Sequence, residues 1–268
     1  MGKPRRRNGS GLDKKTRAFY CNAIRTLQKG DVRFLVGGAY AFSWYTGIER
    51  HTKDFDIFVQ PEDCEQALRT LAAAGYRTEF THPHWLGKAY CGDAFVDVIY
   101  SSGNCVAIVD DLWFEHAAEA TLLDLPLKLI PAEEMIWSKS FIMERERYDG
   151  ADVAHLLRAC ARDLDWRRLL WRFDNHWRVP YGHLVLFGYI YPGERDLLPY
   201  HMMRDLARRL ERELDHPPTD ETVCRGTLIS REQYLEDIGP WGYKDERIED
   251  GVKSPADVER WTDAIASK

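Results

Sequence analysis

Two aspartates separated by a single residue are the strongest candidates for chemistry in this chain. Asp54 and Asp56 lie in the stretch DFDIFV, where hydrophobic residues fill the position between them and those that follow. Side chains alternate between the two faces of a β-strand, so both carboxylates share one face and Phe55 and Ile57 share the other. Two carboxylates this close repel each other unless a cation lies between them. A hard divalent ion such as Mg²⁺ meets that need.

A pair of glycines upstream supplies a second half of the site. The hydrophobic residues 34–36 stop at Gly37 and Gly38, about one helix length before the aspartates. Glycine lets the backbone approach a ligand closely, and a helix that begins at this turn directs unpaired N–H groups toward an anion. A glycine pair alone is common at turns, and an Asp-x-Asp pair alone is common on a solvated strand. Their order therefore carries the prediction of a phosphate and metal site.

A third carboxylate lies further along the chain. Residues 86–91 and 94–100 flank Gly92 and Asp93, which predicts a β-hairpin with Asp97 in its second strand. Asp97 interrupts an otherwise uncharged stretch, so its carboxylate is either buried or faces a site. A buried charge needs a partner, a metal or a raised pKa. The alternative is an aspartate at a strand end that caps a neighbouring backbone group.

These residues resemble a known signature. Gly37-Gly38 followed by Asp54-x-Asp56 looks like the DNA polymerase beta-like nucleotidyltransferase superfamily. The spelling Arg-x-Thr-Lys-Asp-x-Asp-Ile over residues 50–57 is most similar to the AbiEii-type toxin branch and to related uncharacterised bacterial nucleotidyltransferases. Antibiotic nucleotidyltransferases of the lincosamide type are nearer relatives by this spelling than polymerases are.

A second region extends the resemblance. Lys139 on an expected helix, followed by an arginine and by Asp149 and Asp152 in a D-x-x-D pair, resembles the second half of the AbiEii-type pattern. The two regions together cover about residues 34–157. The resemblance therefore says little about the rest of the chain.

The resemblance implies a specific reaction. A nucleotidyl group would pass from a nucleoside triphosphate to an acceptor hydroxyl, with Asp54 and Asp56 holding two Mg²⁺ ions, or Mn²⁺ in their place. Asp97 would complete the metal site and orient or deprotonate the acceptor. The nucleotide-binding residues implied are Gly37, Gly38, Arg50, Lys53 and Lys139, and Asp152 is implied as a catalytic group on the acceptor side.

Three functions fit this site. The first is a toxin-like enzyme that modifies RNA, the second is an adenylyltransferase that modifies an antibiotic, and the third is a non-catalytic module that binds nucleotide or nucleic acid. A basic groove lined by Arg167, Arg168 and Arg172 would favour RNA. An acidic acceptor cleft would favour a cationic antibiotic.

Composition narrows the class of protein. The chain has 268 residues, of which 44% are hydrophobic and 12% aromatic, values that exclude general disorder. A net charge of −6 argues against non-specific nucleic-acid binding by the whole surface. Six cysteines without C-x-x-C pairing predict reduced thiols and neither a zinc site nor a disulfide framework. We expect a cytoplasmic protein without a membrane span.

The elements expected around the site define an α+β fold. We predict a basic tail over residues 1–12, a nucleotidyltransferase domain with a mixed sheet over residues 13–161, and a mainly helical C-terminal region over residues 162–268. Within the domain, the amphipathic pattern of residues 111–125 predicts a helix. Pro131 at a first helical turn predicts another helix that continues to about Tyr148.

Overall fold

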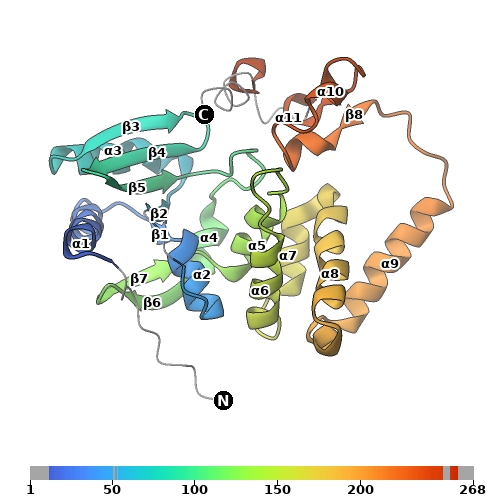
Figure 1. Ribbon diagram of the computed structural model, residues 1–268, viewed down its shortest axis with the longest axis horizontal. Coiled ribbons are helices and arrows are strands. Elements are labelled where there is room, and N and C mark those ends of the chain that lie inside the picture. The colour runs from blue at the N-terminus through green and yellow to red at the C-terminus, as the bar shows by residue number, and fades with distance from the viewer. Residues whose placement is uncertain (1–11, 51, 53, 250–253, 259–268) are drawn as a thin grey trace. The chain divides into compact units, whose positions relative to one another are not determined.

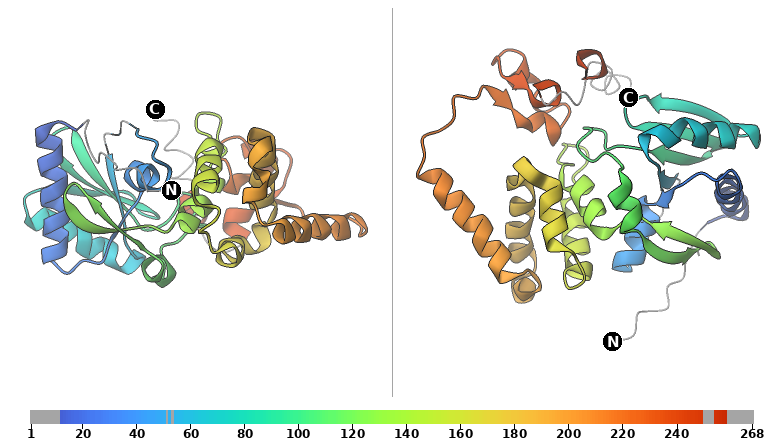
Figure 2. Two further views of the ribbon diagram at one scale, coloured as in Figure 1. Left: turned by 90° about the horizontal axis from the view of Figure 1, so that it is seen from below. Right: turned by 180° about the vertical axis from the view of Figure 1, so that it is seen from behind.

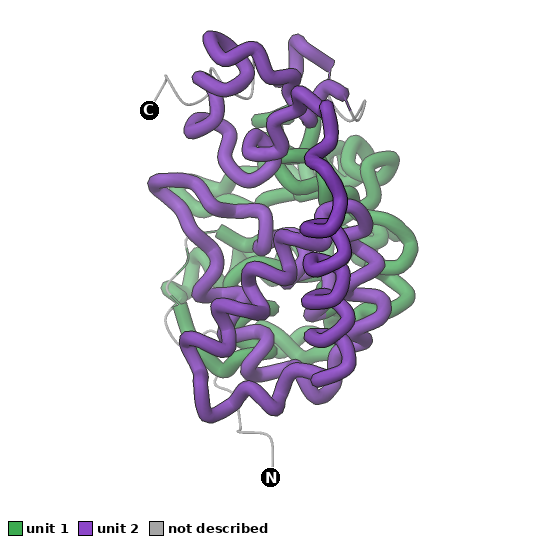
Figure 3. Tube along the Cα trace, turned by 90° about the vertical axis from the view of Figure 1, so that its right-hand side faces the viewer, with its two compact units in different colours: residues 1–131 green, residues 132–268 purple. Residues whose placement is uncertain are grey.

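The computed structural model describes residues 12–50, 52, 54–249 and 254–258 of the chain. Its backbone contacts divide the chain into two compact units, residues 1–131 and 132–268 (Figure 3). The predicted basic tail lies outside the described residues except for Leu12, and so does Lys53. In the described part of the chain, no helix combines the length and hydrophobicity needed to cross a membrane.

A seven-stranded mixed sheet forms the centre of the first unit (Figure 1). Its strand order is β3-β4-β5-β2-β1-β7-β6, with β1 antiparallel to β2 and β2 parallel to β5. The strands are β1 (Leu35–Val36), β2 (Asp54–Phe58), β3 (Arg77–His82), β4 (Leu86–Cys91), β5 (Ala94–Ile99), β6 (Ala118–Leu122) and β7 (Leu125–Leu129). A mixed sheet with flanking helices, followed by a mainly helical region, confirms the predicted fold class.

The sheet has one hydrophobic and one polar face because its central strands alternate. Phe55, Ile57 and Val98 are fully buried on the hydrophobic face. The helices α1 (Lys14–Lys29) and α3 (Cys64–Ala73) pack against each other and against the sheet (Figure 2). The aspartates of β2 and β5 lie on the opposite face of the sheet.

The predicted helix over residues 111–125 was wrong. A short helix, α4 (Asp111–Glu115), is followed by the hairpin of β6 and β7. Leu123 and Asp124 both have positive φ, at 53° and 62°, in the two-residue connection. Such a turn matches the twist of an antiparallel pair, and its backbone conformation outweighs the helical spacing of the hydrophobic residues.

Helices dominate the second unit. They are α5 (Ala132–Ser140), α6 (Gly150–Cys160), α7 (Trp166–Phe173), α8 (Arg178–Ile190) and α9 (Tyr200–Leu214), with the 3-10 helices η2 (Asp174–His176) and η3 (Pro192–Leu197). Because α5 and α6 pack with α7 and α8, the contact division falls at Pro131, whereas the sequence suggested a boundary near Ala161.

The predicted helix from Pro131 to Tyr148 is also shorter than expected. It ends at Ser140, and the chain then folds back on itself with an antiparallel bridge between Met143 and Tyr148. The Glu144 N–H donates to the Arg147 carbonyl at 2.8 Å, which closes a tight turn. Charged residues with good helix propensity therefore form a hairpin here, because local turn bonds replace the helical ones.

The last described residues add short elements to the second unit. They are β8 (Val223–Cys224), η4 (Arg225–Leu228), α10 (Leu235–Ile238), β9 (Lys244–Asp245) and α11 (Glu246–Glu249). Arg247 is fully buried there and forms an ion pair with Asp245 at 2.6 Å. All six cysteines of the chain are free thiols, as the sequence predicted.

Candidate carboxylate site

Three carboxylates meet on the polar face of the sheet. Asp54 and Asp56 lie on β2 with the intervening Phe55 buried beneath them, which confirms the predicted alternation. Asp97 on the parallel neighbour β5 lies directly opposite Asp56 in the pairing register. One carboxylate oxygen from each of the three residues lies within 4.8 Å of the other two. An all-oxygen set of this spacing fits a hard divalent cation such as Mg²⁺ or Mn²⁺.

The glycine pair adjoins these carboxylates. The Gly37 N–H donates to the Asp56 carbonyl at 3.0 Å, and α2 (Gly38–Thr46) begins at the next residue. Gly38 has φ +53°, and a Cβ at this position would collide with the Asp56 carboxylate. Two separate features therefore require glycine at position 38: its backbone conformation and the space that Asp56 occupies. The predicted order of strand, glycine turn, helix and aspartate strand is present.

Lys88 reaches the third carboxylate. Its Nζ lies 2.6 Å from Asp97 Oδ1, and both side chains are mostly buried, at 17% and 12% exposed. Burial raises the pKa of Asp97 above its ordinary value, with a further contribution from Asp54, while the hydrogen bond and charge of Lys88 oppose the shift. The sequence reasoning missed Lys88. The two-residue turn at residues 92–93 could have revealed it, because that turn sets the register in which Lys88 faces Asp97.

The charges of Asp54 and Asp56 also affect two nearby tyrosines. The rings of Tyr20 and Tyr40 pack on Phe55, with centroids 5.1 Å and 4.9 Å from its ring. Burial raises the pKa of both hydroxyl groups, and the charges of Asp54 and Asp56 raise them further. The carboxylates therefore act on groups beyond their own strand.

The segment that leads into β2 supports one carboxylate directly. The Thr52 hydroxyl donates a hydrogen bond to Asp54 Oδ1. The Arg50 guanidinium is exposed and lies over the Phe42 ring, 4.4 Å from its centroid. Thr52 therefore fixes the orientation of Asp54.

Lys139 and Asp152 belong to the second unit and are joined to each other. Lys139 Nζ lies 2.6 Å from Asp149 and 2.8 Å from Asp152, and all three side chains are at most 16% exposed. Arg147 adds a further ion pair to Asp149 at 3.1 Å. Both aspartates of the D-x-x-D pair therefore form ion pairs with cationic side chains of the same unit.

Two of the arginines expected to line a basic groove are turned inward. Arg168 pairs with Glu133 and Glu134, and Arg172 pairs with Glu134 at 3.1 Å. Their side chains are only 9% and 4% exposed, whereas Arg167 is exposed. These contacts neutralise the charge that nucleic-acid binding would need from Arg168 and Arg172.

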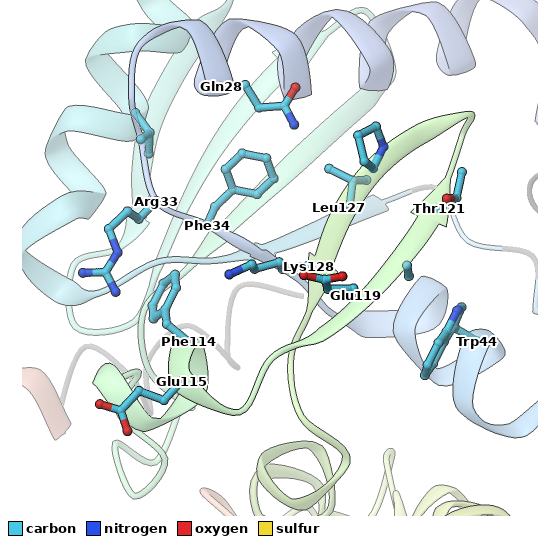
Figure 4. Close-up of a pocket in the computed structure, with 13 residues that line it drawn as sticks. Gln28, Arg33, Phe34, Trp44, Phe114, Glu115, Glu119, Thr121, Leu127 and Lys128 are labelled. Carbon is cyan, nitrogen blue, oxygen red and sulfur yellow. The ribbon is translucent and has the colours of Figure 1, made fainter.

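A separate open cavity of about 940 Å³ lies beside the hairpin of β6 and β7 (Figure 4). Its lining includes Arg33 and Phe34 before β1, Phe114 of α4, and Glu119 and Lys128 of the hairpin. Asp54, Asp56 and Asp97 are not among its lining residues. The cavity is therefore distinct from the candidate site.

Comparison with known proteins gives matches of structure alone. No family model and no curated protein matches the chain. The solution structure of the antibiotic-resistance factor ANT(2″)-Ia is similar at 15% identity and a TM-score of 0.44, covering 66% of this chain and 99% of that chain. The lincomycin-bound crystal structure of the lincosamide antibiotic adenylyltransferase LnuA is similar at 16% identity and a TM-score of 0.39, covering 54% of this chain and 96% of that chain.

A third similar structure is an antigenic nucleotidyltransferase-like protein from Paracoccidioides brasiliensis. It has 12% identity and a TM-score of 0.46, and the match covers 69% of this chain and 93% of that chain. Of these three proteins, the second is an adenylyltransferase and the third is nucleotidyltransferase-like, and none is an AbiEii-type toxin by name. Identities below 25% with TM-scores below 0.5 carry no argument about activity. The carboxylates of the first unit are therefore the structural basis for assigning a function.

Proposed function

We propose that this protein is a metal-dependent nucleotidyltransferase, which moves a nucleotidyl group from a nucleoside triphosphate to an acceptor hydroxyl. The observation that carries the proposal is the meeting of Asp54, Asp56 and Asp97 on one face of the sheet, next to a glycine turn that opens a helix. Like charges gathered at this distance are costly in an empty site, and a divalent cation removes the cost. Asp54, Asp56 and Asp97 would hold that cation.

The residues of the chain have separate tasks in this proposal. Gly37, Gly38 and the start of α2 would bind the triphosphate, with Arg50 and Lys53 adding positive charge. Asp97 would accept the proton of the acceptor hydroxyl, because its carboxylate lies beside the proposed metal position. The acceptor oxygen would then bond to the α-phosphorus as pyrophosphate leaves. A bound metal ion would supply charge stabilisation of the attacking and leaving oxygens.

Lys139 and Asp152 are proposed as structural residues. The resemblance assigns Lys139 to the triphosphate and Asp152 to the acceptor side. Lys139 is already engaged in mostly buried ion pairs, one with Asp149 and one with Asp152. Those contacts support a role in holding the chain between α5 and α6.

A small molecule is the acceptor that we favour over RNA. The internal ion pairs of Arg168 and Arg172 remove the feature that would have favoured RNA. The net charge of −6 favours a cationic acceptor such as an aminoglycoside.

The proposal can be tested by following a labelled α-phosphate. Each of the four nucleoside triphosphates, labelled at the α-phosphate, would be incubated with Mg²⁺ and the protein, together with either total RNA or a panel of aminoglycosides and lincosamides. We expect Mg²⁺-dependent labelling of a small molecule. Labelled RNA would favour the toxin-like alternative, and Mg²⁺-dependent triphosphate binding without any transfer would favour the non-catalytic module.

Variants of the two β2 aspartates test the metal assignment. Asp54→Asn and Asp56→Asn should each lower transfer at least about a thousandfold, because each removes a metal ligand. Their metal-free melting temperatures should equal or exceed that of the wild type, since one of two facing charges is gone. Asp93→Asn in the exposed hairpin turn is the matched control and should keep its activity. Near wild-type turnover in either β2 variant would refute the metal site.

A further inference from the structure

A row of charged residues crosses four strands on the polar face of the sheet. The pairing register places Glu79 opposite Lys88, Lys88 opposite Asp97, and Asp97 opposite Asp56. Residues opposite one another on neighbouring strands share a face and lie close enough to interact. The row therefore connects Lys88 directly to the carboxylates of the proposed metal site.

Lys88 is fixed in this row by its contacts. Its Nζ forms an ion pair with Asp97 at 2.6 Å and lies over the Phe95 ring, 4.1 Å from the ring centroid. Glu79 is engaged elsewhere, since it accepts from the Tyr90 hydroxyl at 2.6 Å and from Arg77 at 3.0 Å. Within the described part of the chain, Asp97 is the one carboxylate that pairs with Lys88. The ammonium group thus belongs to the carboxylate site.

The charge of the site follows from these contacts. The three carboxylates of the cluster and the ammonium group of Lys88 together carry two net negative charges when all are ionised. One divalent cation neutralises that charge. Without Lys88, the same carboxylates would hold a bare cation more strongly, because a fixed positive charge a few ångströms from a bound metal repels it.

We propose that Lys88 is a positioning residue, which holds the Asp97 carboxylate in place in the metal-free protein. Its positive charge also lowers the affinity of the site for a bare divalent ion. This inference rests on the proposed function. It adds that one side chain both stabilises the metal-free site and sets its affinity for metal. A metal ion bound to an anionic triphosphate brings its own negative charge and is repelled less.

The test compares Lys88→Met and Lys88→Arg with the wild type. Mn²⁺ binding would be measured by electron paramagnetic resonance at pH 8 without triphosphate, and melting temperatures would be measured with and without saturating Mn²⁺. Lys88→Met should bind Mn²⁺ about tenfold more tightly, and Lys88→Arg should stay within about twofold of the wild type, because only the first removes the charge. Lys128→Met, which removes an exposed lysine from β7 of the same sheet, is the matched control and should bind as the wild type does.

Melting temperatures separate this role from a merely structural one. Metal-free Lys88→Met should melt below the wild type because Asp97 loses its partner, and saturating Mn²⁺ should restore most of the difference. An equal fall with and without Mn²⁺, or an unchanged or weaker Mn²⁺ affinity in Lys88→Met, would overturn the role of Lys88 and leave the proposed function standing. Absence of Mn²⁺ binding in both the wild type and Lys88→Met would overturn the proposed function, and the inference with it.

Discussion

The two units differ in how their carboxylates are arranged. In the second unit Glu133 and Glu134 are matched by Arg168 and Arg172, two carboxylates to two cations. In the first unit, three carboxylates gather within 4.8 Å of one another, and Lys88 pairs with one of them. The second unit thus pairs buried carboxylates with arginines, whereas the first brings like charges together.

The difference separates structural charge from functional charge. In a buried ion pair, each charge is neutralised by its partner and is not available to bind a ligand. Removing one member of the pair lowers the stability of the fold. An excess of like charge destabilises the unliganded protein, and perturbed groups of this kind cluster at functional sites. The comparison predicts that removing a carboxylate will harm stability in the second unit and ligand binding in the first.

The largest stability effect is expected in the second unit. Glu134 is fully buried, so Glu134→Gln would remove one buried charge that faces both Arg168 and Arg172. We expect a loss of about 3–5 kcal/mol in the free energy of unfolding, the range found when one member of a buried pair is removed. Urea unfolding followed by circular dichroism would measure it.

Glu144→Gln is the matched control for this change. Glu144 pairs with Arg231 at 2.9 Å, but both side chains are 22–24% exposed, so water can replace the lost partner. Its loss should be under about 1 kcal/mol. Equal losses in the two variants would mean that burial does not distinguish the pairs, and the contrast between the units would fail.

Gly38→Ala should have a smaller effect on stability and a large effect on metal binding. The added methyl group would meet the Asp56 carboxylate, and the backbone at φ +53° disfavours any side chain. We expect a loss of about 1–2 kcal/mol in stability from the strained backbone. Mn²⁺ binding should fall at least about tenfold, because displacing a ligand by a fraction of an ångström disturbs a metal site.

Gly47→Ala separates the two causes. Gly47 also has positive φ, at 76°, but a Cβ there would meet nothing within 4 Å. This variant should lose a similar amount of stability and keep its Mn²⁺ affinity. If both variants bind Mn²⁺ as the wild type does, Gly38 is needed for its backbone conformation alone.

The sequence predicted the parts of the site that depend on local periodicity. The alternation around Phe55 placed Asp54 and Asp56 on one face, and the turn at residues 92–93 indicated the hairpin that carries Asp97. Both follow from the period of a strand and from turn chemistry, which neighbouring residues decide. The assignment of these residues to metal and nucleotide binding stays a prediction.

Features that depend on partners distant in the sequence were harder to predict. The amphipathic pattern of residues 111–125 predicted a helix, yet residues 118–122 alternate in burial and pair with β7 across a turn of left-handed residues. Glu134 lies in the first turn of a helix, and nothing in its neighbouring sequence indicates that Arg168 and Arg172 face it, 34 and 38 residues later. Tertiary contacts determined the partners of Glu134, and no local pattern encodes them.

The smallest predicted effect concerns the response of the second unit to acid. Burial alone would raise the pKa of Asp149, but the hydrogen bond from Arg147 and the charges of Lys139 and Arg147 hold it below the ordinary value of 3.8. The unfolded chain therefore takes up the proton before the folded protein does. The stabilisation from Asp149 is fully present above the ordinary pKa and is lost as pH falls through the lower folded value.

Asp149→Asn should remove this part of the acid response. Its unfolding free energy should be lower than that of the wild type at pH 7, and it should fall less steeply than that of the wild type between about pH 5 and pH 3, by about 1.4 kcal/mol for each unit of the pKa shift. Asp93→Asn, in an exposed turn of the first unit, should keep the wild-type slope. Urea unfolding at half-unit pH steps would compare the three proteins. Parallel curves for Asp149→Asn and the wild type would show that Lys139 and Arg147 do not stabilise the charged carboxylate. The ion pairs of Asp149 would then contribute nothing measurable to the free energy of unfolding.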